Sequence, residues 1–169
     1  MRRMATGFTL IEMLVTISIM AILLTIAAPS FNTVIAGTRM SAEINDLQAS
    51  LNFARSEAVK RGLKIDVCPP TTPNGTTCAT TNPLDWSSGW VVLVDGTTTQ
   101  LRISPGVTHG DTLTSTSAAA FPYPEFTPAG YTFFTNTISL HDSNSTSGLY
   151  RCIVFNAGSW ATQQGATCP

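Results

Sequence analysis

The chain has 169 residues, of which 43% are apolar and 11% are charged, less than half of the roughly 25% usual for soluble domains. This composition argues against a soluble cytosolic enzyme, and the length suits one domain with an appendage. The formal net charge of −1 creates no strong field that would attract nucleic acid or anionic lipid. All four cysteines follow residue 60, an even number that favours an oxidising compartment and two disulfides.

The first predicted element is an apolar segment at residues 8–28, which holds one charge, Glu12, in 21 positions. As a helix it rises roughly 31 Å, which matches the hydrocarbon core of a bilayer. Arg2 and Arg3 precede it, so the positive-inside rule keeps the N-terminus in the cytoplasm and places the rest of the chain outside. A secretory signal cleaved after Thr25-Ile26-Ala27-Ala28 is the alternative, but this apolar run is too long for one and contains a carboxylate.

Glu12 is the most informative residue of this segment. A charge within a membrane helix costs a few kcal/mol on insertion scales, so it needs a partner or a function. No basic residue lies between Arg3 and Arg39. Glu12 is therefore either protonated or paired with a group from elsewhere. Cleavage after Gly7 would create such a group, the amino group of Phe8, on the same chain or on a neighbouring subunit.

The residues Gly7-Phe8-Thr9-Leu10-Ile11-Glu12, with a short basic leader before them and Pro29 after the apolar run, resemble the class III signal of type IV prepilins and pseudopilins. The resemblance implies that a prepilin peptidase cuts between Gly7 and Phe8 and that Phe8 is then N-methylated. It also implies that Glu12 pairs with the N-terminus of a neighbouring subunit during filament assembly.

Helical periodicity resumes beyond Pro29, where a bend is expected because proline lacks an amide donor. Charged residues fill most faces, but apolar residues recur at spacings of 4, 3, 4, 3 and 4, at Met40, Ile44, Leu47, Leu51, Ala54 and Ala58. Gly62 follows Lys60 and Arg61, a suitable C-cap with cations in the last turn. The pattern predicts a helix from about Phe8 to Arg61 whose second half lays its apolar stripe on a sheet.

After Gly62 the hydrophobic period changes to two, as Leu63, Ile65 and Val67 alternate with Lys64, Asp66 and Cys68. Further strands are predicted at residues 89–94, 100–103, 131–134 with 138–140, and 149–155, with a hairpin turn at 94–97. The Pro- and Thr-rich stretches 69–83 and 108–124 are expected to be exposed loops. These elements predict an α+β fold, with a long N-terminal helix packed on a small antiparallel β-sheet head, which the pilin resemblance also implies.

The expected organisation has four parts: a prepilin leader peptide at residues 1–7, a transmembrane and filament-core helix at 8–28, an amphipathic helix half at 29–62, and a disulfide-stapled β head at 63–169. In the head, Cys68 and Cys78 enclose nine residues, and Cys152 and Cys168 enclose fifteen. Local pairing therefore closes the shortest loops, although four cysteines permit three arrangements. Each bridge would remove roughly 3 kcal/mol of unfolded-state entropy.

The sequence contains no signal for catalysis or for a bound cofactor. The cysteine spacings do not resemble a zinc site, and both histidines, His109 and His141, lie in loop-like contexts. No nucleophile elbow, P-loop or dinucleotide fingerprint is present. We therefore expect no catalytic residue, no metal and no cofactor.

The helix segment QASLNFARSEAVKRG resembles the L-x-x-A-R-S-E-A-x-x-R pattern of minor pilins and pseudopilins of the GspH/FimT/FimU type, through Arg55, Ser56, Glu57, Ala58 and Arg61. The segment Trp90-Val91-Val92-Leu93, after Ser88-Gly89, resembles the G-W-x-V-F segment of the same group. An ordinary surface helix with solvated Arg55, Glu57, Lys60 and Arg61 is compatible with the same residues.

This group contains proteins with different roles. FimU-like subunits belong to a tip complex that primes pilus assembly, GspH-like pseudopilins to type II secretion systems, and FimT-like subunits resemble DNA receptors of natural transformation. FimT-like proteins have a C-terminal G-R-x-R motif, where this chain has Gly158-Ser159-Trp160-Ala161. Loss of the leader with its two arginines leaves 7 of the 9 basic residues against 10 acidic ones. A FimU-like minor pilin is preferred, with a GspH-like pseudopilin as the first alternative and a FimT-like DNA-binding pilin as the second.

The resemblance also implies partners and a location. The partners are prepilin peptidase, other minor pilins, the major pilin and the inner membrane, and no nucleic acid is expected among them. The location is the bacterial inner membrane, crossed once with the head in the periplasm, and then the pilus tip at the cell surface.

Overall fold

The computed structural model describes residues 7–72, 75–80, 84–116, 122–143, 150–156, 158–165 and 167–168, without the side chains of residues 27–30. The chain forms two compact units, Met1–Gly37 and Thr38–Pro169. We call the first the N-terminal segment and the second the head. One helix, α1, contributes to both units and spans Leu10–Arg61.

Helix α1 has nearly the bounds that the sequence predicts. It ends at Arg61 because Gly62 adopts a positive φ of 66° and donates its N–H to the carbonyl of Ala58 at 3.0 Å. Helical backbone continues through Pro29. The bend expected there falls on residues 27–30, whose side chains lie outside the described part of the chain.

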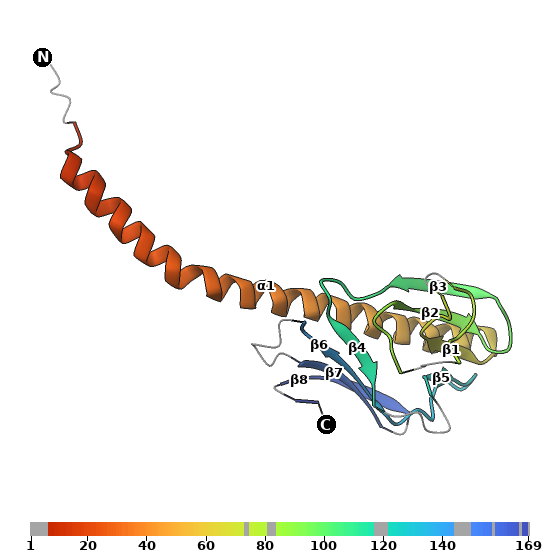
Figure 1. The fold of residues 1–169 in the computed structure, drawn as a ribbon. Coiled ribbons are helices and arrows are strands. Elements are labelled where there is room, and N and C mark those ends of the chain that lie inside the picture. The colour runs from red at the N-terminus through yellow and green to blue at the C-terminus, as the bar shows by residue number, and fades with distance from the viewer. Residues whose placement is uncertain are drawn as a thin grey trace, which may run out of the picture. The chain divides into compact units, whose positions relative to one another are not determined.

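In the described residues, eight strands form two four-stranded antiparallel sheets, and Figure 1 shows both beside the C-terminal part of α1. The first sheet has the order β3-β2-β1-β5 and comprises β1 (Ile65–Cys68), β2 (Gly89–Val94), β3 (Gln100–Pro105) and β5 (Glu125–Phe126). The second has the order β4-β6-β7-β8 and comprises β4 (Thr112–Ser115), β6 (Thr137–His141), β7 (Tyr150–Asn156) and β8 (Ser159–Gly165). The α+β prediction is confirmed, although the head has two sheets.

The apolar stripe of α1 forms the centre of the core. All six residues of the stripe are at most 4% exposed: Met40, Ile44, Leu47, Leu51, Ala54 and Ala58. They belong to one cluster with apolar residues of both sheets, among them Ile65 and Val92 of the first and Ile138 and Ile153 of the second. Each large side chain buried in this way stabilises the fold by roughly 1.5–3 kcal/mol, so both sheets depend on the helix.

Several details of the strand prediction are wrong. Residues 131–134 form no strand and make only an isolated bridge at Thr132, whereas the predicted loop 108–124 contains β4. Strand β8 was not expected, because six of its seven residues are polar or small and its pattern shows no apolar alternation. Strand β1 was expected to alternate, but all four of its residues are buried, including Asp66.

The hairpin turn and the disulfides are confirmed. Gly96 has a φ of 67°, and the N–H of Thr97 donates to the carbonyl of Val94 at 3.1 Å, which closes the turn between β2 and β3. The disulfides join Cys68 to Cys78 and Cys152 to Cys168, with Cα–Cα distances of 5.5 and 5.9 Å. Of the three possible arrangements, the chain adopts the local one.

A buried ion-pair network joins α1 to two connections of the head. The Arg39 guanidinium donates to Asp111 at 2.8–3.1 Å and to Asp142 at 3.0 Å, and the two aspartate side chains are only 0% and 3% exposed. Asp111 lies directly before β4, and Asp142 lies directly after β6. A more exposed pair joins Arg102 of β3 to Asp46 of α1 at 2.9 Å.

We expect Arg39→Met to lower the unfolding free energy of the head by about 3–5 kcal/mol, because it takes the cation away from two buried carboxylates. The matched control is Arg102→Met, whose ion pair is about one third exposed and whose loss should cost less than about 1 kcal/mol. Denaturant titration of the detergent-solubilised chain, followed by tryptophan fluorescence, measures both. Equal effects of the two substitutions would contradict this ranking.

Candidate assembly site

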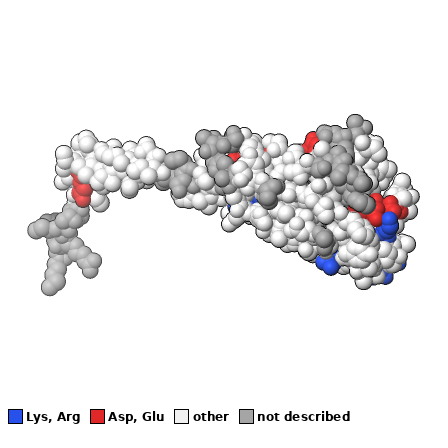
Figure 2. All heavy atoms as spheres, turned by 90° about the horizontal axis from the view of Figure 1, so that it is seen from below, with Lys and Arg blue, Asp and Glu red and all other residues white. Residues whose placement is uncertain are grey.

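The N-terminal segment exposes its apolar side chains. Every large apolar residue from Phe8 to Ile26 is 48–83% exposed. By length and composition, α1 is able to cross a membrane. An apolar surface of this extent requires lipid or other apolar helices around it. Figure 2 shows this segment as white, apart from one acidic spot near its N-terminal end.

Three hydroxyl groups in the described part of the segment donate to the backbone of the helix. Thr16 donates to the carbonyl of Met13 at 2.9 Å, and Ser18 donates to that of Leu14 at 2.7 Å. Thr25 makes the same kind of bond further along. Because these hydroxyl groups donate to carbonyl groups of their own helix, they need no partner from the surroundings, which suits an apolar environment. They leave Glu12 as the one charged side chain between residues 7 and 38.

Glu12 lies in the first turn of α1 and faces outward. The backbone N–H of Glu12 donates to the Thr9 hydroxyl at 3.3 Å, so Thr9 is the N-cap of the helix. Thr9 and Glu12 thus stand in the T-x-x-E spacing of a capping box, a signal that the sequence contained and that our sequence analysis missed. A carboxylate in the first turn is favoured by the helix dipole. The described residues place no basic side chain in ion-pair contact with Glu12.

Gly7 and Phe8 precede the helix and its cap. Neither has helical backbone, Phe8 is 79% exposed, and apart from Gly7 and its chain neighbours no described atom lies within 4 Å of the Cβ position of Gly7. The Gly7–Phe8 bond is therefore sterically open in the part of the chain that the structure describes. The remaining leader residues, including Arg2 and Arg3, lie outside that part.

The helix pattern near residue 55 has a structural explanation in the head. The guanidinium carbon of Arg55 lies 5.7 Å from the centre of the Trp160 ring, a cation–π contact between α1 and β8. Ser56 donates to the carbonyl of Phe53 at 2.7 Å, and Ala58 is in the core. The expectation of a solvated face is right for Arg55 and wrong for Glu57, which is only 8% exposed.

The Glu57 carboxylate contacts both basic side chains in the last turn of α1. It accepts a hydrogen bond from Arg61 and forms an ion pair with Lys60 at 3.5 Å. The hydrogen bond from Arg61 lowers the pKa of Glu57 and keeps the carboxylate ionised. This local network engages both cations that end the helix.

All seven basic side chains after the leader contact a partner. Five form ion pairs with carboxylates at 2.5–3.5 Å: Arg39, Lys60, Arg61, Lys64 and Arg102. Arg55 lies on Trp160, and Arg151 hydrogen-bonds the hydroxyl of Ser41 and the carbonyl of Tyr150. On the face in Figure 2, basic atoms are few and form no continuous area. That face therefore offers no continuous basic patch for phosphates.

Comparisons with known proteins bear on both units. Residues 43–159 match the model of the family "Type II transport protein GspH", and residues 2–28 match the "Prokaryotic N-terminal methylation motif". No curated protein matches the chain. Two crystal structures of the Pseudomonas aeruginosa type IV minor pilin FimU are similar, at 22% identity and TM-scores of 0.58 and 0.55. The matches cover 78% and 76% of this chain and 93% and 96% of the FimU chains.

The FimU likeness confirms the fold that the sequence predicted, a long helix packed on antiparallel sheets. The GspH match covers well over half of the chain, and the methylation motif coincides with the exposed apolar helix and its first-turn carboxylate. Pilins of this kind are structural subunits and not enzymes. The chain therefore belongs to the GspH family of type IV minor pilins and pseudopilins.

Proposed function

We propose that the chain is a minor type IV pilin that helps to prime pilus assembly as part of a tip complex. The single observation that supports this most is the exposed apolar helix with one outward carboxylate, Glu12, in its first turn. Such a helix is unstable alone in water and has two suitable surroundings, a bilayer and a bundle of like helices. A pilin uses both in succession.

The first stage of the proposal is membrane anchoring. The segment 8–28 crosses the inner membrane once, the head faces the periplasm, and prepilin peptidase removes residues 1–7. The two disulfides suit an oxidising compartment on that side. The exposed peptide bond after Gly7 is consistent with proteolysis before the helix cap at Thr9.

The second stage is insertion into a filament with other minor pilins and the major pilin. Cleavage frees the amino group of Phe8, which is then methylated and carries the positive charge that the segment otherwise lacks. Glu12 then pairs with the N-terminus of a neighbour. The bond from the Glu12 N–H to the Thr9 hydroxyl caps the helix, so Glu12 lies in the first turn, where such a neighbour would approach.

A pseudopilin of a type II secretion system is the second candidate, and the description of the matching family favours it. The similarity of the fold to that of the minor pilin FimU favours a role in the pilus. Deletion of the gene separates the two, because loss of surface pili with normal protein secretion supports the tip-complex role. Loss of secretion with normal pili would assign the chain to the secretion machine.

We expect the mature protein to begin at methylated Phe8. We expect cleavage after Gly7 because a short basic leader precedes it, the residue before the cut is small, and the peptide bond is sterically open. Mass spectrometry of protein purified from membranes measures the N-terminal peptide directly. A mature terminus after Ala27 or Ala28 would contradict anchoring by this helix, because the apolar segment would be lost.

We expect both Glu12→Gln and Glu12→Val to be processed and inserted in the membrane but to be lost from filaments. Gln preserves the spacing of the capping box and removes the charge, whereas Val removes both. The two variants therefore separate pairing from capping by the side chain of residue 12, while the bond from the backbone N–H of that residue to Thr9 is available to both. The measurement compares processed protein in membranes with protein in sheared pili. Normal incorporation of Glu12→Gln, with loss of only Glu12→Val, would show that the cap matters and the ion pair does not.

We expect the purified chain to bind DNA weakly or not at all at roughly 150 mM salt. Each phosphate contact adds nearly one unit to the salt dependence, and the basic side chains of the described head are already engaged. A gel-shift titration of the processed protein in detergent measures this. Micromolar or tighter binding, abolished by Arg55→Gln or Arg151→Gln, would favour a FimT-like DNA-binding role.

A further inference from the structure

Three carboxyl groups far apart in the sequence converge at one edge of the first sheet. They belong to Asp66 of β1, Asp95 in the turn after β2, and Glu125 of β5, and we call them the acidic trio. One oxygen of each lies within 4.8 Å of the corresponding oxygens of the other two. Sequence spacing cannot reveal this group, since its members are 29 and 30 residues apart along the chain.

The backbone forces these groups together. Asp66 and Glu125 are direct partners in the antiparallel register of β1 and β5, a position in which like charges destabilise a sheet. The N–H of Asp95 donates to the carbonyl of Lys64 at 3.0 Å, which holds the turn beside the start of β1. The charges therefore cannot separate unless the strand pairing or the turn opens.

Asp66 is the unusual member of the trio. It is only 6% exposed, and its buried Oδ1 has no hydrogen-bond partner in the described part of the chain. Burial, with help from Asp95 and Glu125, raises the pKa of Asp66 to about 7. An unpartnered carboxylate oxygen at such a depth is costly unless a ligand satisfies it.

The one nearby cation satisfies the trio only in part. Lys64 forms an ion pair with Glu125 at 2.7 Å, but its side chain is 51% exposed, and the contact is with Glu125 and not with the buried Asp66. The hydrogen bond to Glu125 raises the pKa of Lys64, so the lysine remains charged. Three carboxylates with one lysine still leave an excess of negative charge around the Oδ1 atom of Asp66.

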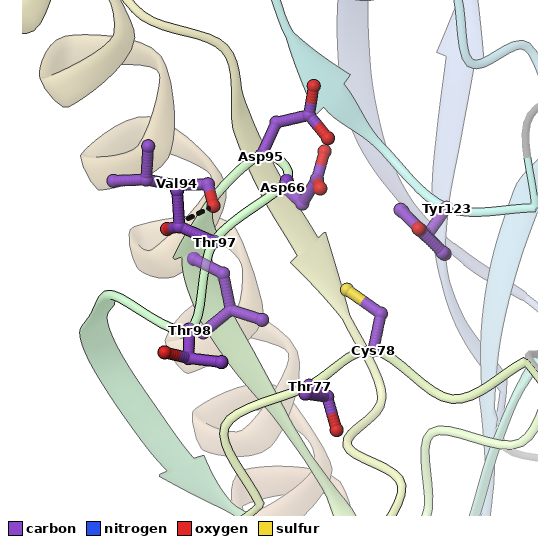
Figure 3. Close-up of a pocket in the computed structure, with 10 residues that line it drawn as sticks. Asp66, Thr77, Cys78, Val94, Asp95, Thr97, Thr98 and Tyr123 are labelled. Atoms are coloured by element: carbon purple, nitrogen blue, oxygen red, sulfur yellow. Dashed lines mark hydrogen bonds between the residues drawn. The ribbon is translucent and has the colours of Figure 1, made fainter.

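A cavity of about 700 Å³ gives access to this excess of charge. Asp66 and Asp95 line it together with Thr77 and Tyr123, and Cys78 of the first disulfide also borders it. Figure 3 shows the carboxyl groups of Asp66 and Asp95 next to each other in this pocket. An ion and several waters have room to enter from solvent.

We propose that the acidic trio binds a divalent cation of the calcium type. Calcium takes oxygen ligands at about 2.3–2.6 Å, so ligands on opposite sides of the ion lie up to about 5 Å apart. The three ligand oxygens lie within 4.8 Å of one another, which is compatible with this geometry. Magnesium demands a near-ideal octahedron at about 2.0–2.1 Å, which carboxylates fixed on three separate backbone segments are less suited to provide than the flexible shell of calcium.

The bound cation would join three separate parts of the head. It would connect the two-residue strand β5 to β1 through the facing pair Asp66 and Glu125, and it would fix the β2–β3 turn through Asp95. The Cys68–Cys78 loop lies along the same cavity. With three protein carboxylates and waters completing the shell, we expect affinity in the range of about 10⁻⁴–10⁻³ M that extracellular modules show. This proposal does not depend on the tip-complex role.

Thermal unfolding of the full detergent-solubilised chain tests the site. For wild type, CaCl₂ at about ten times the dissociation constant should raise Tm by about 4 °C relative to EDTA. Asp66→Asn should abolish the shift, and its Tm in EDTA should exceed that of wild type because the buried charge is gone. Isothermal titration with CaCl₂ should show one site for wild type and none for Asp66→Asn.

Two further variants complete the design. Glu125→Gln should weaken calcium binding at least tenfold. It provides an independent test if Asp66→Asn does not fold. Asp85→Asn, which removes an exposed carboxylate outside the trio, should retain the full shift. The proposal is overturned if wild type shows no shift with CaCl₂, if NaCl of equal ionic strength produces the same shift, or if Asp66→Asn and Glu125→Gln keep it.

Discussion

Burial of one apolar stripe of α1 is the interaction on which the head depends. Both sheets contact the stripe from Met40 to Ala58. Among the described residues, α1 is the one helix against which they pack. A polar substitution within it would therefore weaken both sheets together. The same helix has a different character before residue 38, where its apolar residues surround the axis and are exposed. One element thus buries an apolar stripe in the head and exposes apolar side chains in the N-terminal segment.

The features predictable from the sequence are those encoded by local patterns. The stripe of α1, the glycine cap at Gly62, the turn at Gly96 and the two local disulfides all follow from spacing or from the conformational preferences of single residues. The helix start was predicted within two residues, although the capping role of Thr9 was overlooked. These features require no knowledge of which strands meet.

The features that were not predictable depend on long-range pairing. Strand β8 has few apolar residues and forms because β7 offers a full set of backbone partners, from Asn156 to Tyr150. Arg39 reaches Asp111 and Asp142 over separations of 72 and 103 residues. The burial of Asp66 contradicts its polar place in an alternating strand and follows from pairing on both sides of β1, with β2 and β5. In each case topology decides the environment of a residue whose local pattern indicates otherwise.

The charges of the chain divide into engaged and unsatisfied groups, and this division supports our functional account. The basic side chains of the described head all serve internal contacts, which leaves little positive surface for nucleic acid. Among the acidic groups of the described residues that lack full neutralisation, two have surroundings that suggest a ligand: Glu12 in the N-terminal segment and the acidic trio in the head. We assign the first to a neighbouring subunit and the second to a cation.

The central claim is that the start of α1 contacts other pilins through Glu12. Its most direct test replaces Leu10, which is 83% exposed next to the helix cap, by a photo-cross-linking amino acid in cells that are making pili. Our account predicts cross-links to other minor pilins or to the major pilin, and their loss when Glu12→Gln is added. Cross-links to secretion pseudopilins alone, or pilin cross-links that persist in the double variant, would contradict it.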